Sequence, residues 1–274
     1  MSLFDSFSRL VPAALCVGLA AAPSAADTFK AKYAVSILGL SIGTANFSAS
    51  IDGGSYRTEA NTKLSGLAAL MSSSKGAATS TGSIAPGKVV SSSYATTSAN
   101  GEISRTVRMS FSGGNVTAAD ISPPFEEKPG RVPLNAASKS GVIDPLSATL
   151  MPIPEGQPLV GPNVCNRSLP IFDGFVRFNV NLVYVGTRQV STKGYKGPVS
   201  VCAARYVPLQ GHRPDRPATK FMIDNKQMEV WLAPLERARI AVPYRISVAT
   251  QIGTTVIEAQ EMSVDGPVKA SVAQ

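Results

Sequence analysis

The chain has 274 residues, of which 44% are hydrophobic and 16% are charged, and its formal net charge is +8. This length and composition are typical of a globular protein with a large core. Its Lys and Arg residues are spread along the chain and form no basic stripe interleaved with aromatic residues, which excludes nucleic acid as the expected partner. A basic exported protein is suited to anionic lipid headgroups or other acidic envelope polymers, and plain surface solvation is the alternative.

Residues 1–26 have the pattern of an export signal. A polar start carries Arg9, an apolar run of roughly a dozen residues follows, and Ser24-Ala25-Ala26 precedes Asp27. The run is shorter than the roughly 20 apolar residues that a membrane-spanning helix needs. We therefore expect a mature protein of residues 27–274, without an integral membrane segment, in the periplasm of a Gram-negative bacterium.

The cysteines fit an oxidising compartment. Cys16 lies in the signal, and the bulky Leu15 before it argues against a lipid-anchored cysteine. Cleavage after residue 26 leaves Cys165 and Cys202, for which a disulfide is the default in an exported chain. The sequence has no C-x-x-C motif, and one His with two Cys cannot complete a four-ligand zinc site without acidic help. No metal or cofactor is expected.

Alternation of apolar and polar residues dominates the pattern. Such alternation is typical of antiparallel strands with one face on a core and the other in water. The clearest runs are Tyr33–Ile37, Ala45–Ile51, Ile103–Phe111, Phe175–Val185 and Arg239–Ala249. Hairpin turn signals lie between runs, at Asp52-Gly53-Gly54, Asn100-Gly101 and Gly113-Gly114. Hairpin spacing predicts roughly ten strands.

Helices are expected to be few and short. Asp144-Pro145, with Pro152 further on, predicts one short helix that Asp144 caps. A second helix or loop is expected over Leu64–Met71, where Leu64, Leu67 and Met71 fit a helical stripe. Such a stripe is more often core than ligand site, and we interpret these three residues as a candidate flap over a cavity.

A single mostly β domain is the predicted organisation. Ser122–Val164 is rich in proline and interpreted as an excursion between two groups of strands, with a two-domain split near residue 140 as the competing interpretation. One antiparallel sheet with few helices has to bury its apolar face against itself. We therefore expect a strongly curved sheet, either an open barrel or a barrel-like sandwich.

Gly39-Leu40-Ser41-Ile42-Gly43 matches G-x-S-x-G, the nucleophile elbow of α/β-hydrolases. That elbow needs a strand followed by a helix, whereas alternation after Gly43 predicts a second strand. The glycines are therefore interpreted as a hairpin turn. A serine hydrolase using Ser41 and His212 remains a remote alternative, since His212 follows Ser41 in the chain with Asp144 and Asp173 between them.

His212 is the only histidine and lies in the loop Gly211–Pro217, after a strand that ends near Val207 and before one expected at Phe221. His212, Arg213 and Arg216 form a candidate anion-binding loop, because arginine binds phosphate or carboxylate through two parallel hydrogen bonds. The favoured interpretation is an exposed loop in which Asp215 pairs with a neighbouring Arg, a contact that contributes little.

Several strings together resemble the proteobacterial domain-of-unknown-function family 3108. They are Tyr33, the Gly39 and Gly43 turn, Thr106-Val107-Arg108, Ile143-Asp144-Pro145-Leu146, Leu169–Gly174, Gly211-His212-Arg213-Pro214, Met228–Leu232 and Gly253-Thr254-Thr255. The resemblance covers most of residues 27–274. It implies a periplasmic, β-rich protein and brings no established activity. By fold analogy alone, such a protein is similar to the open barrels of periplasmic lipoprotein carriers, which enclose an apolar cavity.

The function expected first is non-enzymatic: binding of a lipid or other amphiphile in a barrel-like cavity, in support of envelope maintenance. Small residues at Ala45, Ala49, Ala203 and Ala249 would leave room inside the sheet. A side-chain-filled interior is the opposing possibility. The second hypothesis is an interaction or structural module that binds an envelope protein and has no ligand cavity.

Overall fold

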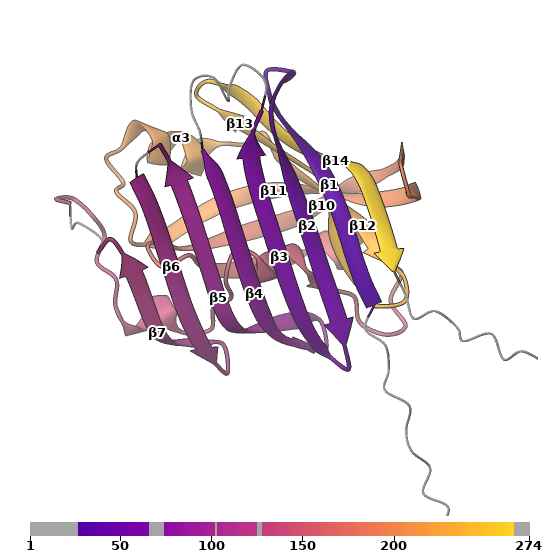
Figure 1. Ribbon diagram of the computed structural model, residues 1–274, viewed down its shortest axis with the longest axis horizontal. Helices are drawn as coiled ribbons and strands as arrows, with labels where there is room; N and C mark the ends of the chain where they lie inside the picture. The colour runs from indigo at the N-terminus through magenta and orange to yellow at the C-terminus, as the bar shows by residue number, and fades with distance from the viewer. Residues whose placement is uncertain (1–26, 66–73, 102, 125–127, 266–274) are drawn as a thin grey trace, which may run out of the picture.

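The computed structural model describes residues 27–65, 74–101, 103–124 and 128–265. The fold is mostly β, as alternation predicts, and its core element is one antiparallel 14-stranded sheet (Figure 1). The strands are β1 Asp27–Ile37, β2 Leu40–Asp52, β3 Ser55–Leu64, β4 Lys75–Ala85, β5 Lys88–Asn100, β6 Ile103–Ser112, β7 Asn115–Ser122, β8 Met151–Pro152, β9 Arg167–Phe172, β10 Arg177–Thr192, β11 Tyr195–Gln210, β12 Met228–Leu235, β13 Ile240–Thr250 and β14 Gly253–Asp265. The described helices are the 3₁₀ turns η1 Ala136–Lys139 and η2 Ser147–Thr149 and the α-helices α2 Pro162–Cys165 and α3 Pro217–Asp224.

The sheet is curved and does not close. Its strand order is β7-β6-β5-β4-β3-β2-β1-β14-β13-β12-β11-β10-β9, with β8 added on β13. Strands β1–β7 form the front layer in Figure 1, and the orange strands β10–β12 pass behind it. The first and last strands, β1 and β14, pair with each other in the middle of the order. Strands from both sides of residue 140 therefore belong to one sheet.

The largest core cluster lies between the two layers. Phe29, Ala49 and Tyr56 contribute to it from β1–β3, and Val199 and Val242 contribute from β11 and β13. On the front layer these residues alternate with outward-facing ones, so one face is apolar and the other is wet. The turns also follow the sequence: Gly53, Gly54, Gly101, Gly113 and Gly114 all have positive φ.

The expectation of roughly ten strands is too low. Strands β3, β4, β5 and β7 are rich in Ser, Thr, Ala and Asn and have weak apolar alternation. They are held by the full ladders that link neighbouring strands, and only a few of their inward-facing side chains are large. Context from neighbouring strands, and not local hydrophobicity, makes these segments strands.

The excursion between the two strand groups fills one end of the space between the layers. Ile143 bridges to Ile171 of β9, and Ala148 and Leu150 join the central core. The short helix expected after Asp144 is only the 3₁₀ turn η2, because Met151 and Pro152 leave it to pair with β13. The N-cap residue of η2 is Leu146, not Asp144 as expected. Asp144 holds the turn from two residues further back, since its Oδ1 accepts the N–H groups of Leu146 and Ser147.

Alternation in β13 predicts that one face of this strand is in water. That expectation is wrong, because the outer face of β11–β13 is covered. Ala241 lies opposite Met151 of β8 and is fully buried. Met151, Ile153, Val164 and Leu232 form a second core cluster there. The proline-rich segment therefore lies on the outer side of this layer as well as between the layers.

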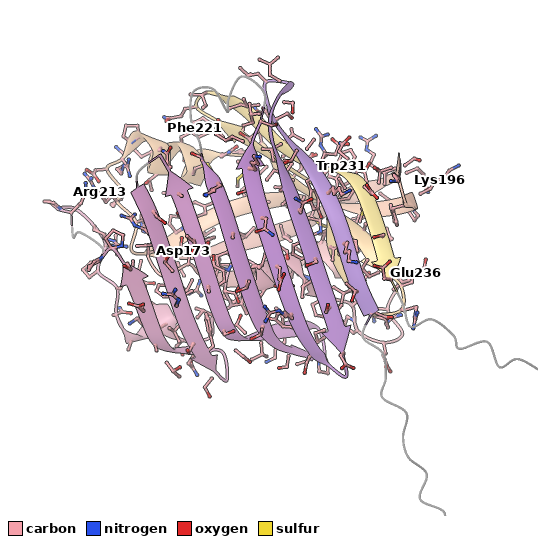
Figure 2. The ribbon with its side chains drawn as sticks, in the orientation of Figure 1. Asp173, Lys196, Arg213, Phe221, Trp231 and Glu236 are labelled. Atoms are coloured by element: carbon pink, nitrogen blue, oxygen red, sulfur yellow. A yellow bond between two sulfur atoms is a disulfide. The ribbon has the colours of Figure 1, made fainter. Side chains whose placement is uncertain are left out.

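The strand expected at Phe221 is the helix α3 instead (Figure 2). Phe221, Met222 and Ile223 are consecutive apolar residues, and so short a run does not distinguish a strand from a helix. Pro217 occupies the first turn, where its missing N–H costs nothing. Met222 packs against the second core cluster, which fixes the helix on β11.

Gly39→Val is expected to lower the free energy of unfolding by about 1–3 kcal/mol, because Gly39 has φ of +81° in the β1–β2 turn. Ser41→Ala is the matched control. Ser41 is exposed in β2, so this change is expected to stay within about 0.5 kcal/mol. Urea unfolding of both variants checks the pair. A loss of biological activity in Ser41→Ala at unchanged stability would contradict this account and favour the hydrolase hypothesis.

Candidate ligand-binding site

A cavity of about 630 Å³, here called the cup, opens at the end of the front layer opposite the excursion. Its volume falls within the range of about 300–1,000 Å³ typical of small-molecule sites. The inward-facing residues that line it are Val35, Gly43, Ala45, Thr62, Leu64, Gly76, Ser98, Arg105 and Ile257. They come from seven strands that are consecutive in the sheet, from β6 to β14.

The cup exists because inward-facing side chains are small along the upper parts of β2–β5. Ala45 lies opposite Thr62, and Thr62 lies opposite Gly76, so three neighbouring strands present little bulk. Further along the same faces stand Phe47, Tyr56 and Tyr94, which pack in the core clusters. Of the small residues expected to leave room, Ala45 lines the cup, whereas Ala49 is fully buried in the core.

A buried polar network lies further along the inner faces of the same strands, beyond the residues that line the cup. Asp144, which has no exposed surface, accepts through Oδ2 the hydroxyls of Ser80 at 2.9 Å, Ser91 at 2.6 Å and Ser147. Tyr56 places its hydroxyl 2.5 Å from Ser147 Oγ. Burial raises the pKa of the Tyr56 phenol above its ordinary value, so the phenol stays protonated. The network ties the excursion to the inner faces of β3, β4 and β5.

The turn between β9 and β10 lies against Arg105 of β6, which lines the cup. Asp173 Oδ1 accepts the N–H groups of Phe175 and Val176, at 2.8 and 2.7 Å, and this shapes the turn. Burial raises the pKa of the Asp173 carboxyl, and the two backbone N–H donors partly offset this rise. Phe175, held there, lies under the guanidinium of Arg105, whose Cζ is 5.6 Å from the ring centroid.

The candidate flap is described only in part. Leu64 ends β3 and lines the cup, half-buried. Leu67 and Met71 lie outside the described residues.

The candidate anion-binding loop is arranged as an exposed loop. Arg213 donates to Asp215 at 3.2 Å, the pairing that the favoured interpretation expects, and Arg213 lies at the margin of the molecule (Figure 2). Arg216 is exposed at the start of α3. His212 is half-buried, its Nδ1 has no hydrogen bond, and burial lowers its pKa. The three side chains therefore do not converge on a common hydrogen-bonded site.

Ser41 and His212 are on separate elements. Ser41 is an exposed residue of β2, opposite Ser36 of β1, in the strand–turn–strand context that the sequence indicates. Within the described part of the chain, no hydrogen bond joins its hydroxyl to His212. The geometry that a serine nucleophile and its base require is thus not formed.

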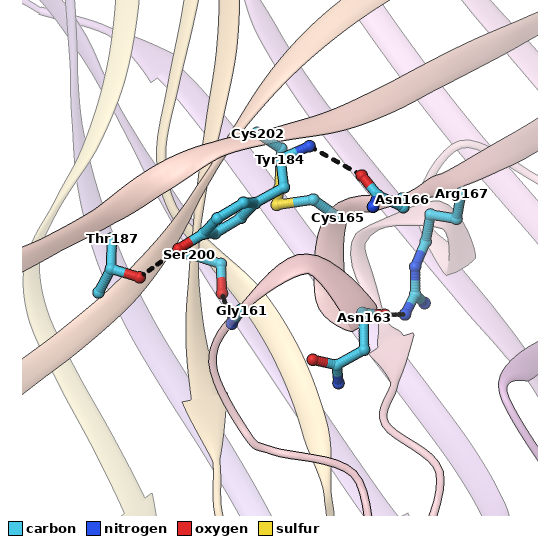
Figure 3. The surroundings of a disulfide bond; sticks show 9 residues. All are labelled: Gly161, Asn163, Cys165, Asn166, Arg167, Tyr184, Thr187, Ser200 and Cys202. Carbon is cyan, nitrogen blue, oxygen red and sulfur yellow. Dashed lines mark hydrogen bonds between the residues drawn. A yellow bond between two sulfur atoms is a disulfide. The ribbon is translucent and has the colours of Figure 1, made fainter.

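Cys165 and Cys202 form a disulfide that closes a loop of 37 residues, as the two-cysteine count predicts (Figure 3). It joins the end of α2 to β11, and both cysteines are fully buried in the second core cluster. Hydrogen bonds support the same junction: Gly161 N–H donates to Ser200 Oγ, and Tyr184 N–H donates to Asn166 Oδ1, each at 2.9 Å. The bond holds the excursion against the C-terminal strands.

Replacing both Cys165 and Cys202 by Ser is expected to lower the free energy of unfolding by about 2–4 kcal/mol, while the fold is retained. The reason is the freedom that the unfolded chain regains, together with two hydroxyls left in an apolar cluster. Urea unfolding and circular dichroism check both parts. Two free thiols in the protein recovered from an oxidising compartment, counted by intact mass with and without reductant, would contradict the linkage.

In the described ranges no group of three or more His, Cys, Asp or Glu residues is placed to hold a metal ion. Nor does any helix in this part of the chain have the length and apolar character to cross a membrane.

The fold and the cup define a β protein with an open, curved antiparallel sheet, a pocket that opens to solvent and a disulfide between Cys165 and Cys202. The chain belongs to the family described as "Protein of unknown function (DUF3108)", whose profile matches residues 28–260. This confirms the family resemblance seen in the sequence. No curated protein matches the chain.

Among solved structures, the chain is similar to a beta-barrel-like protein of the domain of unknown function DUF1849 from Brucella abortus. The two share 9% sequence identity with a TM-score of 0.49, and the alignment covers 89% of this chain and 99% of that one.

Proposed function

We propose that this protein is a non-enzymatic, exported binding protein that takes the acyl chain of a lipid or similar amphiphile into the cup, and so supports maintenance of the cell envelope. The observation that carries the proposal is the cup itself. It is open to solvent, and its inward-facing lining is small or aliphatic apart from Arg105, with Lys63, Lys75 and Asn100 at its margin. A site of this shape suits a flexible apolar chain more than a rigid polar substrate.

Exposed aliphatic side chains near the open end support the same proposal. Leu38 and Leu40, in and beside the β1–β2 turn, are 69% and 70% exposed, and Ile252 in the β13–β14 turn is 75% exposed. The two turns adjoin, since Leu38 N–H donates to Thr254 O. Apolar side chains on a turn beside the mouth would let a lipid pass from a membrane surface into the cup without crossing water.

The disulfide fits an oxidising compartment and therefore supports export. The proposal is tested by purifying the exported chain without detergent and extracting it with organic solvent for mass spectrometry. We expect a lipid or fatty acid in near-stoichiometric amount, absent from another exported protein prepared in the same way. An empty protein that also takes up no fluorescent fatty-acid probe would contradict the proposal and favour the protein-interaction hypothesis.

A further inference from the structure

One wall of the cup carries a positive charge on its inner face. Arg105 lies opposite Ser98 in the β5–β6 ladder, and two positions further along β6 stands the buried Val107. Arg105 therefore occupies a position that alternation assigns to the interior. Its side chain is half-buried and lines the cup.

Among the residues that the structure describes, Arg105 has no anionic partner. Its guanidinium lies against the Phe175 ring, and its Nε is buried without a hydrogen bond to these residues. Most other arginines of the same ranges pair with a carboxylate, as Arg57, Arg108, Arg213, Arg237 and Arg245 do, or donate to backbone carbonyls, as Arg131, Arg167, Arg177, Arg205 and Arg239 do. Arg188 and Arg216 make neither contact there, but both are exposed to solvent and do not line the cup.

The polar and apolar ends of the cup are separated. Arg105 and Ser98 stand on β6 and β5, whereas Val35 and Ile257 stand on β1 and β14, at the other side of the lining. A guanidinium that is partly removed from water and lacks a counter-ion is unfavourable unless a ligand supplies one. Its planar donors match the two oxygens of a carboxylate or a phosphate.

We propose that Arg105 binds the oxyanion head group of an acyl-chain ligand, a carboxylate or a phosphate, while the chain extends from it along the cup toward Val35 and Ile257. This inference rests on the proposed function, because it specifies the class of amphiphile that the cup takes. Phe175 holds the guanidinium in place through the ring face.

The test compares three ligands with one chain length: dodecanoate, dodecyl phosphate and dodecan-1-ol, measured by calorimetric titration of the full exported chain. For Arg105→Gln we expect binding of at least one anion to weaken on the order of tenfold, with dodecan-1-ol changed by less than about twofold. Arg105→Lys is expected to retain part of the anion binding, because lysine keeps the positive charge but cannot form the two parallel hydrogen bonds of a guanidinium. The anion whose affinity falls more in Arg105→Gln identifies the preferred head group.

Arg108→Gln is the matched control, since Arg108 is on the same strand with its side chain 65% exposed outside the cup. It is expected to leave binding of all three ligands unchanged. Equal losses for the alcohol and the anions, or no loss in Arg105→Gln at an unchanged melting temperature, would overturn the role of Arg105 and leave the cup as an amphiphile site. Failure of the unmodified protein to bind any of the three would overturn the proposed function itself.

Discussion

Asp144→Ala is expected to lower the free energy of unfolding by about 3–5 kcal/mol, an effect of the size seen when a buried charged hydrogen-bond acceptor is removed. The carboxylate accepts three serine hydroxyls and two backbone N–H groups, and it has no exposed surface. Without it these donors stay buried and unsatisfied. The excursion would also lose its main polar attachment to β4 and β5. Urea unfolding followed by circular dichroism measures the change.

Asp144→Asn is the conservative control. It retains one carbonyl oxygen for the N–H groups of Leu146 and Ser147, and serine hydroxyls rotate to accept from its amide. We expect a loss of about 1–2 kcal/mol, clearly smaller than that of the Ala variant. Equal stability of the Ala variant and the unmodified protein would show that the network does not hold the excursion on the sheet.

Thr62→Trp is expected to weaken binding of a fluorescent fatty-acid probe on the order of tenfold or more, equivalent to about 1.4 kcal/mol or more. Thr62 faces into the cup, is exposed there, and stands opposite Gly76, so an indole at this position occupies the space that the ligand needs. Trp also suits a strand, so the fold is expected to persist.

Asn61→Trp provides the matched control, because Asn61 is the neighbouring residue of β3 and faces the outer side of the sheet. The same large side chain there is expected to leave probe affinity within about twofold of the unmodified protein. Similar weakening by both variants would place the probe elsewhere or indicate a general loss of structure. Melting temperatures of the two variants separate these outcomes.

Much of the fold follows from the sequence because the sheet is built from local hairpins. Alternation, the glycine pairs at 53–54 and 113–114 and the single turn glycine at 101 suffice to predict an antiparallel, curved sheet, and the disulfide follows from the cysteine count. Strands β3–β5 have weak patterns, since their inward-facing residues are small where the cup lies. The small inward-facing residues that leave room for the cavity therefore also weaken the sequence pattern by which these strands could be predicted.

The site residues were harder to predict, because they converge only in three dimensions. Asp144 is predicted from the sequence as a helix cap, but Ser80 and Ser91 reach it from strands more than fifty residues away. For Arg105 a signal was present in the sequence. Arg105 lies two positions before Val107 and is thus in the same alternating series as Val107, Met109 and Phe111, the core-facing residues of that strand. A lone charge on the apolar face of an amphipathic strand points into the protein.

The most direct test of binding in the cup is to map which residues of the protein contact the acyl chain of a bound fatty acid. The protein is loaded with a fatty acid that carries a photoreactive diazirine, irradiated and digested, and the labelled residues are assigned by tandem mass spectrometry. Because side chains alternate along a strand, neighbouring positions report opposite faces. We expect labels on inward-facing residues such as Ala45, Thr62 and Ser98, with competition by unlabelled fatty acid. Labels on the outward-facing Asn61 and Thr97, or labelling that no competitor reduces, would contradict binding in the cup.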